Sequence, residues 1–152
     1  MEDGARFRDQ FSHVANSCEK YSNNLGNSFK SRFEHLGELS DLEDAISTLG
    51  DAVDLTPHGH PDRPHRLHNL GNSFKARFER LGELSNLEQA ISLYFHAASA
   101  TIGPISVRFR ASQKWISCAR LIHHHSLLHA CSTAISLFPQ LAWIGLSLSP
   151  FL

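Results

Sequence analysis

The sequence has little cysteine and no cysteine pairing motif. Its three cysteines, Cys18, Cys118 and Cys131, lie far apart and form no C-x-x-C. An odd number of widely spaced cysteines argues against a disulfide framework and is typical of a reducing compartment. The N-terminus is charged and leads into no apolar segment of the kind that secretory signals carry. We therefore expect an intracellular, cytoplasmic protein.

Charged residues are missing from one end of the chain. No Asp, Glu, Lys or Arg follows Arg120, and residues 135–152 form an uncharged run just long enough to cross a membrane. Because Pro139 and Pro150 interrupt this run and no basic cluster flanks it, we expect no membrane span. Two alternatives stay open: a helix that folds back on the stack, or one that docks on a following domain, a second subunit or another partner. The residues expected to make such a docking contact are Leu141, Trp143 and Ile144.

Length and composition point to one globular domain. The chain has 152 residues, of which 41% are hydrophobic and 19% charged, and a net charge of −1 with histidine neutral. A chain of this length buries about 68–70% of its unfolded surface, which is enough for a core. This balance argues against an intrinsically disordered tail and against a protein that binds nucleic acid through its charge, so we expect no nucleic-acid partner. Phosphate-binding loops and paired-carboxylate motifs are missing as well.

An internal repeat organises the sequence. Residues 24–47 return at residues 69–92, an offset of 45, and the two segments differ at four of 24 aligned positions. The differing pairs are Ser31/Ala76, His35/Arg80, Asp41/Asn86 and Asp44/Gln89. Segments this similar are expected to fold alike, and a repeat of this length indicates a repeat architecture.

Each repeat is predicted to form two helices joined by a short turn. Apolar residues recur at helical spacing in the first half of both repeats. They are Leu25, Phe29, Phe33 and Leu36, and then Leu70, Phe74, Phe78 and Leu81. Gly37 and Gly82 follow where a left-handed C-cap is expected, and Ser40-x-x-Glu43 and Ser85-x-x-Glu88 predict capping boxes at the start of the second helices.

One helix pair cannot cover its own apolar stripe, so successive pairs must stack. We therefore predict an all-α helical-repeat solenoid of about six or seven antiparallel helices. In a degenerate third repeat, Ala134–Pro139 echoes Ala52–Pro57. The expected divisions are an N-terminal segment at 1–19 that can include the start of the first helix, repeats at 20–61 and 62–103, the third repeat at 104–139, and an apolar C-terminal segment at 140–152.

These repeats resemble tetratricopeptide (TPR) repeats. Leu25-Gly26-x-x-Phe29 and Leu70-Gly71-x-x-Phe74 match the L-G-x-x-Y element of that family. The spacing of Ala45, Ala52 and Pro57 matches its second helix and terminal proline. The sequence departs from the family because the leading tryptophan is absent and the period exceeds the usual length of about 34 residues.

More narrowly, three segments resemble the TPR arrays of fungal proteins in which the array precedes a CHAT domain, a caspase-like module. The segments are NNLGNSFKSRFEHLGELSDLEDAIS, LTPHGHPDRP and FPQLAWIGLSLS. The resemblance implies an array that recruits or restrains a peptidase. Because this chain has no segment for the histidine–cysteine dyad, it implies a short array or the truncated N-terminal side of a longer one.

A polar face on the leading helix of each repeat is the first candidate site. It consists of Lys20, Asn23, Asn27 and Lys30 in the first repeat and of His65, His68, Asn72 and Lys75 in the second. The TPR resemblance implies that this face lines a concave groove, where amides and cations hold the backbone or carboxylate of an extended peptide. The alternative is an ordinary solvated helix face, which the i,i+4 pairs Lys30/Glu34 and Lys75/Glu79 favour.

Histidines offer a second candidate, a metal site. The imidazoles that could come together are those of His58, His60, His65 and His68, and separately those of His125 and His129. No C-x-x-C or H-E-x-x-H accompanies them, so we favour scattered surface histidines and expect no metal or other cofactor. Catalysis has no motif either, since Cys118 and Cys131 lie in apolar helical patterns and are expected to be core residues.

Together these features predict a non-enzymatic scaffold that uses TPR-like repeats to bind a peptide or protein partner. The first alternative is the regulatory or recruitment arm of a CHAT-type cysteine peptidase whose catalytic domain is absent from this chain. The second alternative is a histidine-based metal-binding protein.

Overall fold

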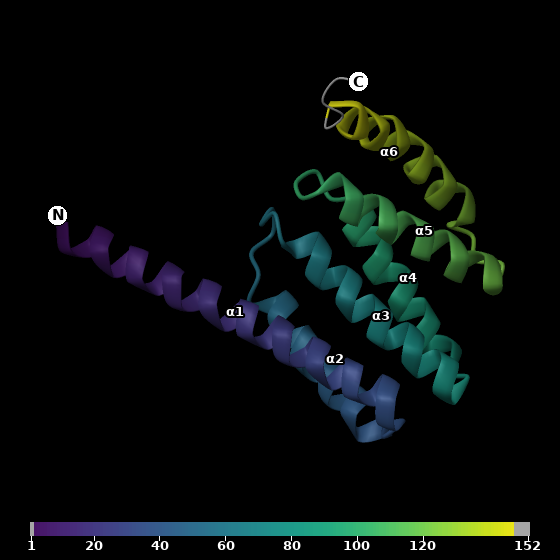
Figure 1. The fold of residues 1–152 in the computed structure, drawn as a ribbon, viewed down its shortest axis with the longest axis horizontal. Helices are drawn as coiled ribbons and strands as arrows, with labels where there is room; N and C mark the ends of the chain where they lie inside the picture. Colours follow the sequence, from purple (N-terminus) through teal and green to yellow (C-terminus); the bar gives the residue numbers. More distant parts are fainter. Residues whose placement is uncertain (1, 148–152) are drawn as a thin grey trace. The chain divides into compact units, whose positions relative to one another are not determined.

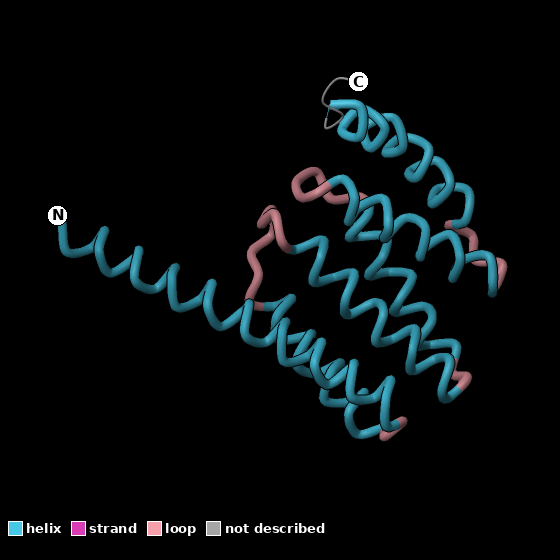
Figure 2. Tube along the Cα trace, in the orientation of Figure 1, coloured by secondary structure: helices cyan, strands magenta, loops and turns pink. Residues whose placement is uncertain are grey.

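The computed structural model describes the backbone of residues 2–147 and the burial of the side chains at residues 12–144. Six α-helices make up most of this part of the chain. They are α1 (Glu2–Leu36), α2 (Leu39–Asp54), α3 (Arg63–Leu81), α4 (Leu84–Ala98), α5 (Ile105–Leu121) and α6 (Leu127–Ser147). No strand occurs among the described residues, and Figure 2 shows only helices and short loops. The predicted all-α, helical-repeat-like fold is confirmed.

The chain divides into two compact units, Met1–His58 and Gly59–Leu152. Unit 1 is one antiparallel helix pair, α1 and α2 (Figure 1). At their contact, a Cβ added to Gly26 would lie 2.5 Å from Cγ of Leu49, a side chain that is completely buried. Glycine at this position therefore lets the two helices approach more closely than any other residue would.

Unit 2 contains two helix pairs, in which each helix packs against the next one along the chain. Helix α3 also contacts α5, and α4 contacts α6, so the α5/α6 pair stacks on the α3/α4 pair (Figure 1). Large buried side chains in this stack include Leu87 and Tyr94 of α4 and Trp115 of α5. The predicted stacking of successive helix pairs is therefore present within unit 2.

The two repeats have the same turn between their helices. Two residues separate the helices in both units, Gly37 and Glu38 in unit 1 and Gly82 and Glu83 in unit 2. Gly37 has a φ of 75° and Gly82 a φ of 73°, so both take the left-handed conformation that glycine adopts without steric cost. These values confirm the predicted C-caps.

The predicted capping boxes are wrong. Helices α2 and α4 begin one residue before Ser40 and Ser85, so Glu38 and Glu83 occupy the N-cap positions, and neither makes a side-chain cap hydrogen bond. The serines lie inside the first helical turn, where they cannot act as N-caps. The backbone of the two glutamates is extended, which places the helix start at the leucine that follows each of them.

Side-chain contacts near the helix start differ between the units. In unit 1, Arg32 donates from Nε at 2.8 Å and from a second guanidinium nitrogen to the carboxylate of Asp41. In unit 2, Asn86 stands in place of the aspartate and donates from Nδ2 to Oε2 of Glu83 at 3.0 Å. One of the four differences between the repeats thus replaces an interhelical ion pair by a local amide–carboxylate hydrogen bond.

Some expected helix positions are corrected by the structure. Leu36 and Leu81, which were placed on the apolar stripe, are 65% and 40% exposed because they end their helices at the turn. Helix α1 begins at Glu2, so the N-terminal segment expected at 1–19 is, from Glu2 onward, part of this helix.

The C-terminal helix also differs from the expectation. Helix α6 continues through Pro139 to Ser147, so the apolar segment expected at 140–152 is, up to Ser147, the last eight residues of this helix. Residues 148–152 lie outside the described part of the chain. Because Pro139 is exposed, water can hydrogen-bond to the backbone carbonyl that its ring leaves without a helical partner.

Candidate functional site

The predicted polar face of unit 1 lies on α1 and is only partly at the surface. Lys20 is exposed, Asn27 is half-buried, and Lys30 forms the expected ion pair with Glu34. Asn23, in contrast, is only 8% exposed. Its amide therefore belongs to the buried side of α1, which corrects its placement on a peptide-binding face.

The equivalent face of unit 2 lies on α3. His65 is exposed, Asn72 is half-buried, and Lys75 forms the expected ion pair with Glu79. His68 is only 5% exposed, so its placement on an accessible face is also corrected.

His68 is buried against α4 and lies near α5. Its ring centroid is 5.7 Å from that of Tyr94. Burial, followed by the positive charges of Arg110, His65 and Lys114, lowers the pKa of His68 to about 4. The imidazole is therefore neutral at neutral pH and contributes packing to this region rather than charge.

Asn72 is held by the same tyrosine. The hydroxyl of Tyr94 donates to Oδ1 of Asn72 at 2.8 Å. Burial raises the pKa of Tyr94, so the hydroxyl stays protonated and acts as the donor. The bond fixes the Asn72 amide, whose Nδ2 can donate to a ligand. Unit 1 has Leu49 at the position of Tyr94, so the repeat does not reproduce this contact at Asn27.

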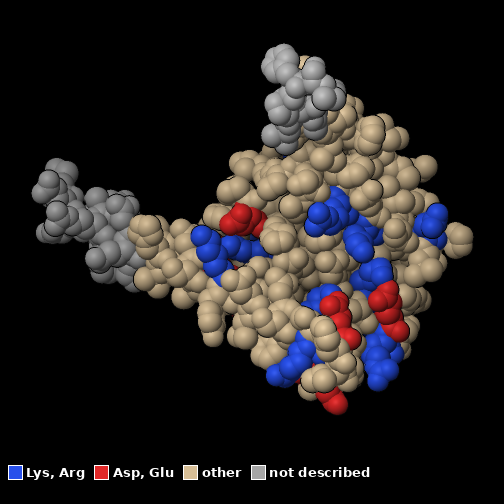
Figure 3. Space-filling model, in the orientation of Figure 1, with Lys and Arg blue, Asp and Glu red and all other residues tan. Residues whose placement is uncertain are grey.

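Helix α5 adds two basic residues that the sequence did not reveal. Arg110 is exposed, Lys114 is half-buried, and both act electrostatically on His68. Lys114 also acts, together with Lys75 of α3, on the thiol of Cys118. The group His65, Asn72, Lys75, Arg110 and Lys114 is called the α3/α5 face below. Figure 3 shows lysine and arginine side chains gathered over this part of unit 2.

The cysteine beneath this face is a core residue. Cys118 is 1% exposed, and burial raises the pKa of its thiol to about 11, although Lys75 and Lys114 act in the opposite direction. The thiol is therefore protonated at neutral pH, whereas a nucleophilic cysteine needs its thiolate form. The expected core position of Cys118 is confirmed, while Cys131 is half-buried.

The histidines singled out in the sequence do not assemble into a metal site within the described part of the chain. No group of three or more His, Cys, Asp or Glu side chains there could hold a metal ion. His125 and His129 do come together, since both line the same cavity in unit 2. His60 instead accepts a hydrogen bond at Nδ1 from the backbone of Asp62 at 3.1 Å.

Helix α6 exposes much of its apolar surface. Trp143 is 74% exposed, Ile144 is 43% exposed and Leu141 is half-buried, so all three residues expected to dock on a partner are accessible to some degree. The window Leu127–Ile144 has a mean hydropathy of 1.3, and only 11% of it is buried. By length and composition alone this helix could cross a membrane, so the expected absence of a span stays a prediction.

Comparisons with protein-family models, with curated proteins and with solved structures found no match for this chain.

Proposed function

We propose that this protein is a non-enzymatic interaction module that binds an acidic segment of a partner protein on the α3/α5 face. The observation that carries the proposal is a cluster of basic residues: Arg110 and Lys114 lie near the neutral His68, and Lys75 and Lys114 lie near Cys118. Helix α5 contains four basic residues and no acidic one, so Glu79 is the only carboxylate on α3 or α5. A carboxylate ligand would compensate this excess of positive charge.

The charge distribution along the chain supports an acidic partner. Residues 59–152 contain nine Lys or Arg and four Asp or Glu, whereas residues 1–58 contain five and eleven. Unit 2 therefore has a net charge of +5 and unit 1 a net charge of −6, with histidine neutral. Such a positive unit attracts acidic segments and repels basic ones before contact.

The face offers two kinds of contact to an extended peptide. Arg110 and the two lysines would pair with carboxylates, while the amide of Asn72 would donate to a backbone carbonyl. Since Tyr94 already holds Asn72, little side-chain freedom is lost there on binding. This mode of binding is the one implied by the TPR resemblance, and the close helix pairing at Gly26 and Gly71 supports that family as a proposal.

Binding of a labelled acidic peptide, followed by fluorescence anisotropy, tests the proposal. The probe is an alternating Glu/Leu peptide, and its Lys/Leu counterpart is the control. We expect the acidic peptide to bind and the basic peptide not to bind. The Arg110→Gln/Lys114→Gln variant should bind the acidic peptide at least about tenfold more weakly, since a charge-assisted hydrogen bond contributes about 1.5–3 kcal/mol. The matched control is Arg120→Gln, an exposed position on the same helix.

Two results would contradict the proposal. One is equal binding of the acidic and the basic peptide. The other is a double variant that binds the acidic peptide as tightly as the parent does while its helicity is unchanged.

A further inference from the structure

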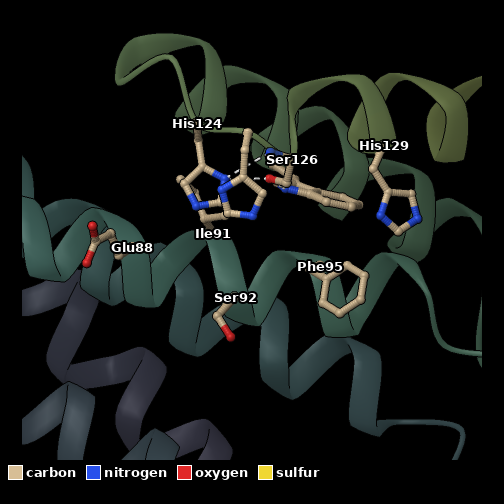
Figure 4. Close-up of a pocket in the computed structure, with 9 residues that line it drawn as sticks. Glu88, Ile91, Ser92, Phe95, His124, Ser126 and His129 are labelled. Carbon is tan, nitrogen blue, oxygen red and sulfur yellow. Dashed lines mark hydrogen bonds between the residues drawn. The ribbon is translucent and has the colours of Figure 1, made fainter.

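Unit 2 contains a cavity of about 360 Å³ that shares no residue with the α3/α5 face. It is formed by α4, by Trp115 of α5, by the loop between α5 and α6, and by His129 at the start of α6 (Figure 4). Cavities that hold small organic ligands have volumes of about 300–1,000 Å³ and are lined mainly by apolar and aromatic side chains with a few polar groups. The cavity has this size and composition.

One end of the cavity is aromatic. Phe95 and His129 each lie edge-on to the indole of Trp115, with ring centroids 5.1 Å and 5.2 Å from it, and their own centroids are 5.6 Å apart. In Figure 4 the rings of Phe95, on α4, and His129, on α6, lie next to each other at this end of the cavity. The three rings therefore pack edge to face against one another, and together they form an aromatic wall against which a further flat ring can pack.

The loop that covers the cavity is held in place by hydrogen bonds. The Trp115 indole N–H donates to Oγ of Ser126 at 2.8 Å, and this oxygen lies 2.7 Å from Nδ1 of His124. The backbone N–H of Ser126 donates to the same Nδ1 at 3.2 Å. Nδ1 of His124 is therefore an acceptor. His123 precedes this network with a φ of 51°, a left-handed conformation that few non-glycine residues adopt.

The other end of the cavity carries its only formal charge. Glu88 is the one charged residue among the lining side chains, and no lysine or arginine lines the cavity. Phe95 lies seven positions after Glu88 on α4, so the carboxylate end and the aromatic end are about 10 Å apart along the helix. Ile91 lies between them and is only 3% exposed.

From this arrangement we infer that the cavity binds an aralkyl amine, a small molecule in which a short apolar chain joins an aromatic ring to an ammonium group. The ring lies in the cavity and packs against the aromatic wall formed by Phe95, Trp115 and His129. The chain crosses Ile91, and the ammonium pairs with Glu88, whose exposed carboxylate points away from Phe95 and His129 in Figure 4 and turns toward the ligand on binding. An anion of the same shape is disfavoured because it would face the carboxylate.

The first repeat supplies a natural control for this site. Glu43 and Ile46 of α2 are the repeat equivalents of Glu88 and Ile91, but Gly50 stands where α4 has Phe95. A site that depends on Phe95 is therefore specific to the second repeat. Glu43→Gln is therefore the matched control for Glu88→Gln, because it replaces the same residue type at the equivalent position of the first repeat, which does not line the cavity.

Three probes of one shape test the inference. Phenylbutylamine, phenylbutanol and phenylbutyrate share a phenyl ring and a four-carbon chain and differ in the end group, which is an ammonium, a hydroxyl or a carboxylate. Calorimetry on the full chain measures the affinities. Fluorescence in a Trp143→Phe background locates the bound probe, because Trp115 is then the only tryptophan. We expect the amine to bind up to about fivefold more tightly than the alcohol, with the carboxylate weakest, and to change the Trp115 emission.

Variants separate the contributions of the two ends. Glu88→Gln, a substitution at an exposed position, should abolish the preference for the amine over the alcohol, whereas Glu43→Gln should preserve it. Phe95→Leu should weaken all three probes about tenfold with helicity retained. The inference is overturned if no probe binds saturably, if the carboxylate binds as tightly as the amine, or if the preference survives Glu88→Gln.

Discussion

The contact of Gly71 with Tyr94 gives the sharpest test of how the helix pairs are built. A Cβ added to Gly71 would lie 2.8 Å from Cε1 of Tyr94, closer than side-chain atoms normally approach. Tyr94 is fully buried and bonded to Asn72, so its ring cannot move aside without breaking other contacts. Overpacking of this kind costs about 1–3 kcal/mol. Alanine in place of glycine inside a helix gains about 1 kcal/mol. We therefore expect Gly71→Ala to lower the free energy of unfolding by up to about 2 kcal/mol, where an open helical position would gain about 1 kcal/mol.

Gly50 provides the matched control, because it lies inside α2 and a Cβ there would meet nothing within 4 Å. Gly50→Ala should raise the free energy of unfolding by about 1 kcal/mol, because alanine favours the helix more than glycine does and meets no obstacle here. Urea unfolding followed by circular dichroism measures both variants, together with Gly26→Ala as the equivalent of Gly71→Ala in unit 1. If Gly71→Ala and Gly26→Ala stabilise the protein as Gly50→Ala does, the close approach of the helices is not what requires glycine.

Two predictions concern acid. The Arg32 guanidinium, through its hydrogen bonds and then its charge, lowers the pKa of Asp41. The stability from this pair is therefore complete above the ordinary carboxyl pKa of about 4 and is lost as the pH falls through the lowered value. Asp41→Asn introduces the residue that the second repeat has at Asn86. In this variant the free energy of unfolding, measured as a function of pH, should lose the part of its decrease at acidic pH that comes from Asp41. His68 takes up its proton near pH 4 in the folded state but near 6.5 when unfolded. Stability should fall by about 3 kcal/mol as the pH drops from about 6.5 to 4, and His68→Gln should remove this loss. If the pH dependence of the unfolding free energy is unchanged in Asp41→Asn, the ion pair with Arg32 does not contribute as described. If it is unchanged in His68→Gln, the burial of His68 does not lower its pKa as described.

The helix pairs could be predicted from the sequence because their determinants are local. Apolar spacing and the left-handed glycines, Gly37 and Gly82, define two helices and a turn without reference to the rest of the chain. The prediction of the capping boxes was wrong because the motif does not fix the first residue of the helix. Ser40-x-x-Glu43 satisfies the motif, but the same pattern fits a helix that starts one residue earlier, and the extended backbone of Glu38 selects that start.

The candidate site could be predicted only in part, because it depends on contacts between helices that are distant in sequence. His65, Asn72 and Lys75 came from the repeat, whereas Arg110 and Lys114 lie in a third helix pair that has lost its similarity to the first two. The burial of His68 arises from Tyr94 and α5, neither of which its own helix pattern contains. The cavity at Phe95 has no counterpart in the first repeat, so comparison of the repeats could not reveal it.

Chemical-shift mapping on the full chain tests the proposed binding face most directly. The isotope-labelled protein is titrated with the alternating Glu/Leu peptide. The shifts are expected to change at Asn72, Lys75, Arg110 and Lys114 and to stay constant along α2. Changes centred on another surface, or none at saturating peptide, would contradict the assignment of the α3/α5 face as the place where this protein holds its partner.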